Sequence, residues 1–402
     1  MSSDSRYRLP GTTFTRRRIG ALVGIGVVGA VFTGLLNDTR RVVDGVLEWP
    51  DTAFYGLPDP IPDGAPGTIY RKEELGSAPT GTRAWRVLYH SRDRSDTNIL
   101  VSGLVVVPDG PAPEAGRPIV SWAHPTTGIA PHCAPSAGID PFILIEGMHD
   151  FLDAGYVIAA TDYSGMGAAG PDAYLVGLTE GHNVLDVARA ARSLPEAAAN
   201  DHLMLWGHSQ GGHAVLFAGH LASAYAPEFH LRGAAVAAPA AEIAALMRAD
   251  IGDMSGVTIG SYAFITYNRV YGAPLDVILT PEAIAATEEI GPVCLLTHMR
   301  EIHEIATPFV GHYVKADPGT VEPWASILAE NTPPAERFPV PLFVAQGDTD
   351  TLVRPEITAA FVAQQVELGA DVTFVKLPDT GHGLVADRAL RRLMEWLATL
   401  PT

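Results

Sequence analysis

Short apolar runs alternate with longer helix-like stretches along most of the chain. Eight runs have strand length: Trp85–Tyr89, Ile99–Val107, Ile119–Ala123, Val157–Ala160, Leu203–Trp206, Ala234–Ala238, Leu342–Ala345 and Val372–Val375. Five stretches predict helices: Phe142–Ala154, Gly181–Ser193, Gly212–Ala224, Pro355–Leu368 and Val385–Leu397. Three strands followed by alternating strands and helices predict an α/β fold whose mostly parallel central sheet is flanked by helices on both faces.

This alternation stops between residues 240 and 337. About 100 residues separate two strand candidates there, which is far longer than an ordinary connection between elements. Helix-like pieces occur inside the interval at Ala241–Met247 and Pro281–Glu289. We therefore predict a large helical cap or lid, residues 240–337, inserted into a core made of residues 83–239 and 338–402.

The N-terminal residues have the pattern of an export signal. A basic cytoplasmic-side tail, residues 1–18, ends in three consecutive Arg residues and is followed by Ile19–Leu36, 18 residues without a charge. As a helix this run spans about 27 Å, slightly less than the apolar layer of a membrane. Residues 19–36 are therefore interpreted as a signal peptide or membrane anchor. An extended lead-in segment, residues 37–82, precedes the core and is rich in Pro and Gly from Asp51 to Pro79.

The position of the Arg residues predicts the direction of export. Because they lie before the apolar run, the rest of the chain is expected to cross the membrane, and the triple Arg also resembles a twin-arginine signal. An ordinary buried helix is the alternative, but three adjacent Arg residues are hard to place beside a core. The sequence leaves open a secreted protein and a protein anchored on the outer face of the cytoplasmic membrane.

Composition and charge exclude several classes of protein and partner. Of 402 residues, 47% are hydrophobic and 18% are charged, which excludes intrinsic disorder. The net charge is −18; the first 18 residues carry five Arg and one Asp, or +4, which leaves −22 for the rest. A chain this acidic repels the phosphate backbone of a nucleic acid, and we therefore expect no nucleic-acid partner. We expect contact with a membrane only through the N-terminal segment. The sequence does not indicate an oligomeric state.

The strongest chemical signal is the sequence GHSQG, Gly207 to Gly211, between a strand-like run and a helix-like stretch. A Ser at a sharp strand-to-helix turn requires small neighbours, which Gly207 and Gly211 supply. The N-terminus of the following helix points its N–H groups toward an oxygen that becomes charged. Ser209 is therefore the candidate nucleophile, and the alternative, a solvent-facing Ser in a Gly-rich turn, fits this context poorly.

A Ser hydroxyl needs a base, and the base needs an acid to orient it. Both residue types follow Ser209 in the chain. His382 lies between two Gly residues after the last predicted strand and is the candidate base. Asp350, in a G-x-x-D-x-x-V loop after the run Leu342–Ala345, is the preferred acid, and Asp348 in the same loop is the alternative.

Two main-chain N–H groups are expected to form an oxyanion hole. The first belongs to Gln210, directly after the nucleophile. The second is expected in the loop after the run Ile119–Ala123, which reads PTTG from Pro125. Pro125 has no N–H, so Thr126 or Thr127 must donate, and we prefer Thr127. A simple turn capped by the Thr side chains is the alternative.

The sequence implies no metal and no organic cofactor. His298 and His303 in the cap are five positions apart and do not share a helix face. His213 is expected to be a helix residue near the site rather than a metal ligand, and His208 is expected to pack at the top of the sheet. The Gly-rich loop after the run Val157–Ala160 lacks the spacing of a nucleotide-binding motif.

Together these motifs resemble the secretory lipase family, the lipase-A type of α/β-hydrolase. The likeness extends from about Asp51 to the C-terminus and rests on SWAHPTTG followed by CAPS, ATDYSGMG, TEGHNVLDVARAARSLP, GHSQGGHA, GDTDTLV and TGHGL. The family commonly has an HGTTG-like loop where this chain has Pro125. The resemblance implies an α/β-hydrolase fold with a large helical lid between the sixth and seventh strands.

The same resemblance implies a function. It indicates an exported lipase or carboxylesterase that cleaves small-molecule or lipid esters through an acyl-enzyme, with a triad of Ser209, Asp350 and His382. It also implies a disulfide between the two cysteines, Cys133 and Cys294. An acyltransferase with the same triad is one alternative. A non-catalytic binding domain on the same scaffold is another, and the presence of all three triad residues argues against it.

Overall fold

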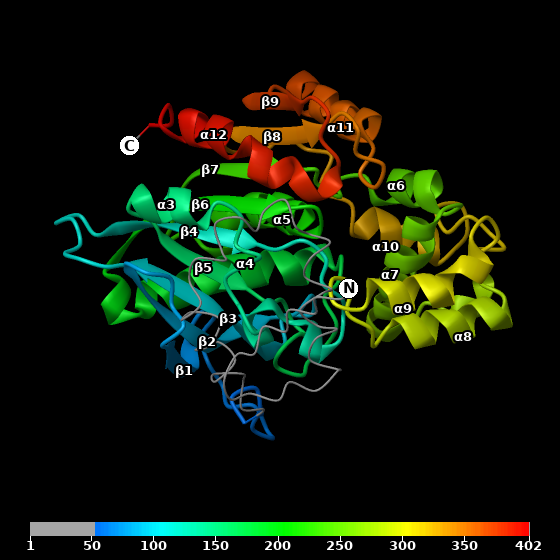
Figure 1. Cartoon of the computed structure of the whole chain (residues 1–402), viewed down its shortest axis with the longest axis horizontal. Helices are drawn as coiled ribbons and strands as arrows, with labels where there is room; N and C mark the ends of the chain where they lie inside the picture. Colours follow the sequence, from blue (N-terminus) through cyan, green and yellow to red (C-terminus); the bar gives the residue numbers. More distant parts are fainter. Residues whose placement is uncertain (1–52, 402) are drawn as a thin grey trace, which may run out of the picture. The chain divides into compact units, whose positions relative to one another are not determined.

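The computed structural model describes residues 53–401, and its strands form one mixed sheet (Figure 1). The nine strands of the described chain lie in the order β1-β2-β3-β5-β4-β6-β7-β8-β9. Their bounds are β1 Ile69–Leu75, β2 Thr82–Arg92, β3 Asn98–Pro108, β4 Arg117–Ala123, β5 Val157–Thr161, β6 Ala199–His208, β7 His230–Ala237, β8 Leu342–Gly347 and β9 Val372–Leu377. Neighbours from β5 to β9 are parallel, whereas β1, β2, β3 and β5 pair antiparallel.

Helices cover both faces of this sheet. Side chains on one face of the sheet form an apolar cluster with α4, α5 and α11. Side chains on the other face form a second cluster with α3 and α12. The bounds are α3 Met148–Asp153, α4 Gly177–Ser193, α5 Gln210–Tyr225, α11 Pro355–Glu367 and α12 Val385–Leu397, with short 3-10 turns η3 Pro131–Cys133, η4 Pro135–Ala137, η5 Pro195–Ala197 and η8 His382–Leu384. The predicted α/β class, a mostly parallel sheet between two helical layers, is confirmed.

The segment between β7 and β8 is helical and has its own apolar core. Its elements are α6 Ile243–Asp250, α7 Met254–Tyr271, η6 Leu275–Val277, α8 Pro281–Ile290, α9 Met299–Ala306, η7 Thr307–Phe309 and α10 Trp324–Glu330. Figure 1 shows them on the right, beyond the end of the strands. Tyr262, Phe264, Tyr313 and Trp324 are among the buried side chains of this separate cluster. This segment supports the predicted cap, which we continue to assign to residues 240–337.

Two elements differ from the sequence prediction. Strand β1 lies within the segment expected to be extended, and it was missed because most of its side chains are exposed on an edge strand. The cap consequently falls between the seventh and eighth strands rather than the sixth and seventh. Helix α3 begins only at Met148, because Gly147 has a left-handed backbone with φ 82° and the preceding residues form turns.

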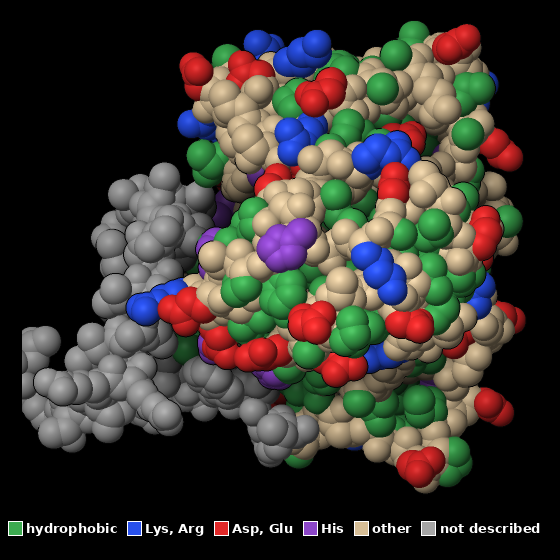
Figure 2. Space-filling view, turned by 90° about the vertical axis from the view of Figure 1, so that its right-hand side faces the viewer, with side chains coloured by type: hydrophobic (Ala, Val, Ile, Leu, Met, Phe, Trp, Pro, Cys, Tyr) green, Lys and Arg blue, Asp and Glu red, His purple; other side chains and the backbone are tan. Residues whose placement is uncertain are grey.

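The described residues provide no evidence on the N-terminal signal. None of their helices is both long and apolar enough to cross a membrane. The predicted signal peptide or anchor, Ile19–Leu36, lies outside the described residues. On the face shown in Figure 2, basic side chains are scattered among acidic ones.

Candidate active site

Ser209 stands at the turn between β6 and α5. Its backbone has φ 57° and ψ −116°, a conformation that a non-Gly residue seldom adopts. A side chain at Gly207 would overlap the carbonyl of Gly211, and one at Gly211 would overlap the carbonyl of Ala123 on β4. The two Gly residues therefore permit the sharp turn that the sequence predicts, and the turn holds Ser209 at the carboxyl end of β6.

The imidazole of His382 contacts both Ser209 and Asp350. Its Nε2 lies 2.9 Å from Ser209 Oγ, and its Nδ1 lies 2.8 Å from Asp350 Oδ2. The three residues follow three different parallel strands, β6, β8 and β9, whose carboxyl ends meet at the same edge of the sheet. The structure thus assembles a hydrogen-bonded chain from residues 209, 350 and 382, the arrangement that lets an imidazole accept a hydroxyl proton.

Asp350 is held as an ionised carboxylate. Its Oδ1 accepts hydrogen bonds from the N–H groups of Leu352 and Val353, both at 2.9 Å, and Gln346 Nε2 donates to Oδ2 at 3.2 Å. Burial alone would raise the pKa of Asp350, but the hydrogen bond and charge of His382, with the two N–H donors, hold that pKa below its ordinary value. An ionised Asp350 fixes the His382 tautomer in which Nε2 is free to accept a proton.

The alternative acid, Asp348, makes no hydrogen bond to His382 in the described part of the chain. Its side chain is exposed, and its Oδ1 accepts a 3.4 Å hydrogen bond from the Thr380 N–H. Of the two carboxylates left open by the sequence, the structure brings Asp350 to the imidazole and uses Asp348 to hold the loop before His382.

The loop after β4 contains both candidates for the second oxyanion donor, Thr126 and Thr127. Thr126 and Gln210 line the same cavity as Ser209, but Thr127 does not. The carbonyl of Thr127 instead accepts a 2.9 Å hydrogen bond from the N–H of Leu295 in the cap. Neither the Thr126 nor the Gln210 main-chain N–H donates a hydrogen bond to another described residue. The lining of this cavity favours Thr126, the alternative that the sequence left open, over Thr127 as the candidate second donor.

A disulfide joins this loop to the cap. Cys133 and Cys294 are bonded across 161 positions of sequence, as the resemblance implies. A side chain at Gly128 would lie only 2.7 Å from Cys133 Sγ, so the loop packs directly against the bridge. Together with the hydrogen bond from Leu295, the bridge restrains the segment that carries the oxyanion donor.

Removal of the bridge is expected to destabilise the protein. Cross-linking so long a loop contributes about 4–5 kcal/mol in the chain-entropy model. The Cys133→Ala/Cys294→Ala double variant is therefore expected to unfold at a clearly lower urea concentration than the wild type, measured by circular dichroism. Two free thiols in wild-type protein purified without reductant, detected by mass spectrometry, would contradict this expectation.

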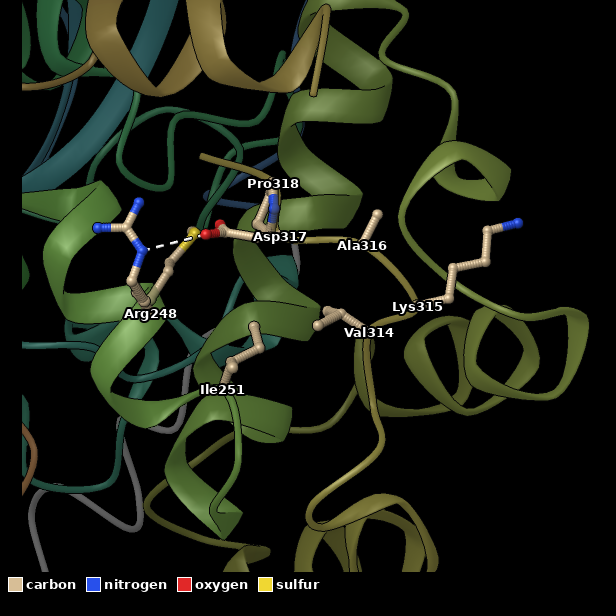
Figure 3. Close-up of a pocket in the computed structure, with 8 residues that line it drawn as sticks. Arg248, Ile251, Val314, Lys315, Ala316, Asp317 and Pro318 are labelled. Atoms are coloured by element: carbon tan, nitrogen blue, oxygen red, sulfur yellow. Dashed lines mark hydrogen bonds and ion pairs between the residues drawn. The ribbon is translucent and has the colours of Figure 1, made fainter. Parts of the chain in front are cut away.

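Two cavities lie on either side of helix α6. The inner one, about 60 Å³, adjoins Ser209 and includes Met247 and Ile251 in its lining. Met247 and Ile251 also line the outer one, about 190 Å³, which lies within the cap. Figure 3 shows Arg248 paired with Asp317 at the outer cavity, and the Nε to Oδ2 distance is 3.0 Å. Met247 and Ile251 thus line both the space next to the nucleophile and a larger space in the cap.

One buried polar residue near the site, Glu180, was not recognised in the sequence. Glu180 on α4 is fully buried and accepts hydrogen bonds from Gln210 Nε2 at 2.7 Å and from the N–H of Leu175 at 3.0 Å. Its other oxygen lies 2.8 Å from His213 Nδ1. His213 is thus a buried neighbour of the site, as expected, and its partner is a carboxylate. These contacts fix the first turn of α5, which carries the oxyanion donor.

Among the described residues, the one cluster with metal-like spacing joins His132 to Cys133 and Cys294. Both of its sulfur atoms are consumed by the disulfide. His298 contacts Thr297 at 2.8 Å rather than His303.

The fold and the arrangement at Ser209 are those of an α/β-hydrolase. The structure of Candida antarctica lipase A in its closed state superimposes with a TM-score of 0.70 and 19% identity over 88% of each chain. The profile of the Secretory lipase family matches residues 142–398. The chain therefore belongs to the Secretory lipase family.

Curated relatives carry related names. Lipase A of Moesziomyces aphidis is 27% identical over 199 residues, 46% of this chain but only 42% of that protein. Lipase A of Arthroderma benhamiae is 24% identical over 379 residues, 86% of this chain and 78% of that protein. A probable inactive lipase of Mycobacterium tuberculosis is 24% identical over 236 residues, 54% of this chain and 52% of that protein. Alignments with the first and third relatives thus span about half of their length.

Proposed function

We propose that this protein is an exported serine hydrolase that cleaves carboxylic esters of the lipid type. The observation that carries the proposal is the hydrogen-bonded chain from Asp350 through His382 to Ser209 Oγ. Membership of the Secretory lipase family supports ester hydrolysis and export. One relative is named as a probable inactive lipase, but a non-catalytic scaffold has no need to retain all three triad residues in contact.

The proposed reaction has two halves. His382 accepts the proton of Ser209 as its Oγ attacks the ester carbonyl, and then gives that proton to the leaving alcohol. The main-chain N–H groups of Gln210 and Thr126 stabilise the negative oxygen of each tetrahedral intermediate. A water molecule then gives a proton to His382 and attacks the acyl-enzyme. His382 returns that proton to Ser209 Oγ as the acid leaves. The residues of this chain supply every proton transfer, so the mechanism calls for no cofactor.

The cavities support a substrate with an extended acyl chain. The inner cavity of about 60 Å³ has room for roughly two water molecules, enough for a short acyl group. The outer cavity of about 190 Å³ lies beyond Met247 and Ile251. Displacement of these two side chains would connect the cavities, so we propose that the cap sets the acyl length that the site accepts.

A panel of p-nitrophenyl esters from short to long acyl chain tests both proposals. The wild type is expected to release p-nitrophenol together with the free acid. Met247→Ala removes a side chain shared by both cavities, so the ratio of kcat/KM for long esters to kcat/KM for the acetate is expected to rise several-fold. Leu296→Ala, an exposed apolar residue of the cap that lines neither cavity, is the matched control.

The ester panel tests the proposed activity and the proposed role of the cap independently. Absence of hydrolysis with every ester would contradict the proposed activity, and acyl transfer to an added alcohol without free acid would identify an acyltransferase. Hydrolysis with the same chain-length preference in wild type, Met247→Ala and Leu296→Ala would contradict only the role proposed for the wall between the cavities.

The proposed organisation follows the sequence prediction. We assign residues 1–18 and 19–36 to a basic tail and an export segment, and residues 37–82 to the lead-in, which contains β1. The α/β-hydrolase core is formed by residues 83–239 and 338–402. The secretory name of the family supports an extracellular location for this core.

A further inference from the structure

A second histidine, His208, lies next to the candidate base, His382. His208, the residue before Ser209, is 2% exposed, and its ring centroid is 5.1 Å from that of His382. Its Nδ1 lies 2.9 Å from Glu146 Oε2, and its Nε2 lies 3.1 Å from the main-chain carbonyl oxygen of His382. His208 therefore bridges a carboxylate and the backbone of the candidate base.

Both partners of His208 are hydrogen-bond acceptors. A neutral imidazole has a single N–H and can donate to one of them only, which leaves a lone pair facing the other oxygen. One proton added to a neutral His208 beside an ionised Glu146 turns both contacts into hydrogen bonds. This proton can be on the ring of His208 or on the carboxyl of Glu146. This conclusion does not depend on the tautomer, because each ring nitrogen faces an acceptor.

We propose that Glu146 and His208 are positioning residues that hold the base of the reaction, His382, through its main-chain carbonyl by means of this shared proton. The inference rests on the proposed ester hydrolysis at Ser209. While the proton is present, the Nε2–H of His208 donates to the carbonyl of His382. When the proton is lost, the remaining N–H faces the negative Glu146, and the carbonyl of His382 loses its donor.

The tether joins an open turn around His382 to a packed part of the fold. Gly381 and Gly383 flank His382, and a side chain at either position would meet no atom within 4 Å. The other end of the tether is fixed, because Trp206 Nε1 on β6 donates a 2.9 Å hydrogen bond to the carbonyl of Glu146. The tether thus links a rigid strand to a Gly-flanked turn that carries the imidazole.

The charges around His208 favour retention of the proton. Burial opposes a charge on this ring, but Glu146 and, more distantly, Asp350 outweigh burial, so the pKa of His208 lies above its ordinary 6.5. The groups that face the ring are Glu146 from the turn before α3, His382 from η8 and Asp350 from the loop after β8. Because the pKa is raised, the tether is present at low and neutral pH and is lost as the pH rises.

The test is the pH dependence of kcat/KM for a short p-nitrophenyl ester between about pH 6 and pH 10, after subtraction of spontaneous hydrolysis. Wild-type kcat/KM is expected to fall about three- to tenfold toward alkaline pH, the effect of one lost hydrogen bond. In Glu146→Gln the amide donates to Nδ1 of a neutral His208, whose Nε2–H still donates to His382. The alkaline fall is therefore expected to disappear in this variant.

Two further variants complete the experiment. His208→Gln offers the carbonyl of His382 an amide donor that does not titrate, so it is also expected to lack the alkaline fall and carries the test if Glu146→Gln does not fold. Glu395→Gln changes an exposed carboxylate on α12, paired with Arg391 and Arg392, and is expected to keep the wild-type profile. Melting temperatures at each pH monitor folding.

The results separate this inference from the proposed function. A wild type without esterase activity would overturn the proposed function and the tether with it. An active wild type with no alkaline fall, or an equal fall in wild type, Glu146→Gln and His208→Gln, would overturn the tether alone. A fall confined to the wild type and Glu395→Gln supports the shared proton.

Discussion

Replacement of Ser209 by Ala is expected to lower kcat for ester hydrolysis by about 10³- to 10⁶-fold, and His382→Ala is expected to lower it to a similar level, because triad members act as a unit. The two losses are expected to be similar because each variant removes one partner of the 2.9 Å hydrogen bond between His382 Nε2 and Ser209 Oγ. Without the hydroxyl no acyl-enzyme forms, and without the imidazole the hydroxyl keeps its proton. Steady-state kinetics with p-nitrophenyl butyrate measures both losses.

A matched control distinguishes loss of chemistry from loss of folding. His303 is an exposed histidine of the cap helix α9, so His303→Ala is expected to retain wild-type kcat. The melting temperatures of all three variants are expected to remain close to the wild-type value. Near-normal hydrolysis by His382→Ala would show that another group acts as the base.

The second large effect concerns the acid. Asp350→Asn is expected to reduce kcat about 10⁴-fold, the size of loss known when a triad carboxylate becomes an amide. An amide nitrogen facing Nδ1 favours the wrong tautomer of His382, and the charge that stabilises the imidazolium is lost. Because the pKa of Asp350 is held below its ordinary value, the carboxylate stays ionised throughout the neutral and mildly acidic range, and its contribution is lost only at low pH.

The neighbouring carboxylate provides the control. Asp348→Asn changes an exposed residue whose contact is the Thr380 N–H at 3.4 Å, so kcat is expected to change by less than about tenfold. The same kinetic assay compares the two variants, with melting temperatures to follow folding. A larger loss in Asp348→Asn than in Asp350→Asn would transfer the role to Asp348.

Much of the fold follows from local patterns that the sequence displays. Buried parallel strands are continuous apolar runs, and helix α12 has the same bounds as its prediction, Val385–Leu397. Strand β1 was missed because an edge strand with exposed side chains has no such pattern. The candidate nucleophile and base could be predicted because GHSQG and the Gly-flanked His382 encode backbone geometry that few other residues permit.

The rest of the site depends on contacts between distant segments. Glu146 is 62 positions from His208, and Glu180 is 33 positions from His213, so no local pattern pairs these carboxylates with their histidines. The choice between Thr126 and Thr127 depends on which residue of one loop reaches the cavity beside Ser209. Asp348 and Asp350 share a loop in the same way, and packing alone decides which carboxylate meets the imidazole.

The central claim is that Ser209 is an activated nucleophile. The most direct measurement is peptide mapping by mass spectrometry after treatment with an active-site-directed fluorophosphonate. We expect one covalent adduct, on the peptide that contains Ser209, with parallel loss of esterase activity and no adduct in Ser209→Ala. An active wild type that remains unlabelled, or that carries the adduct on another residue, would contradict it.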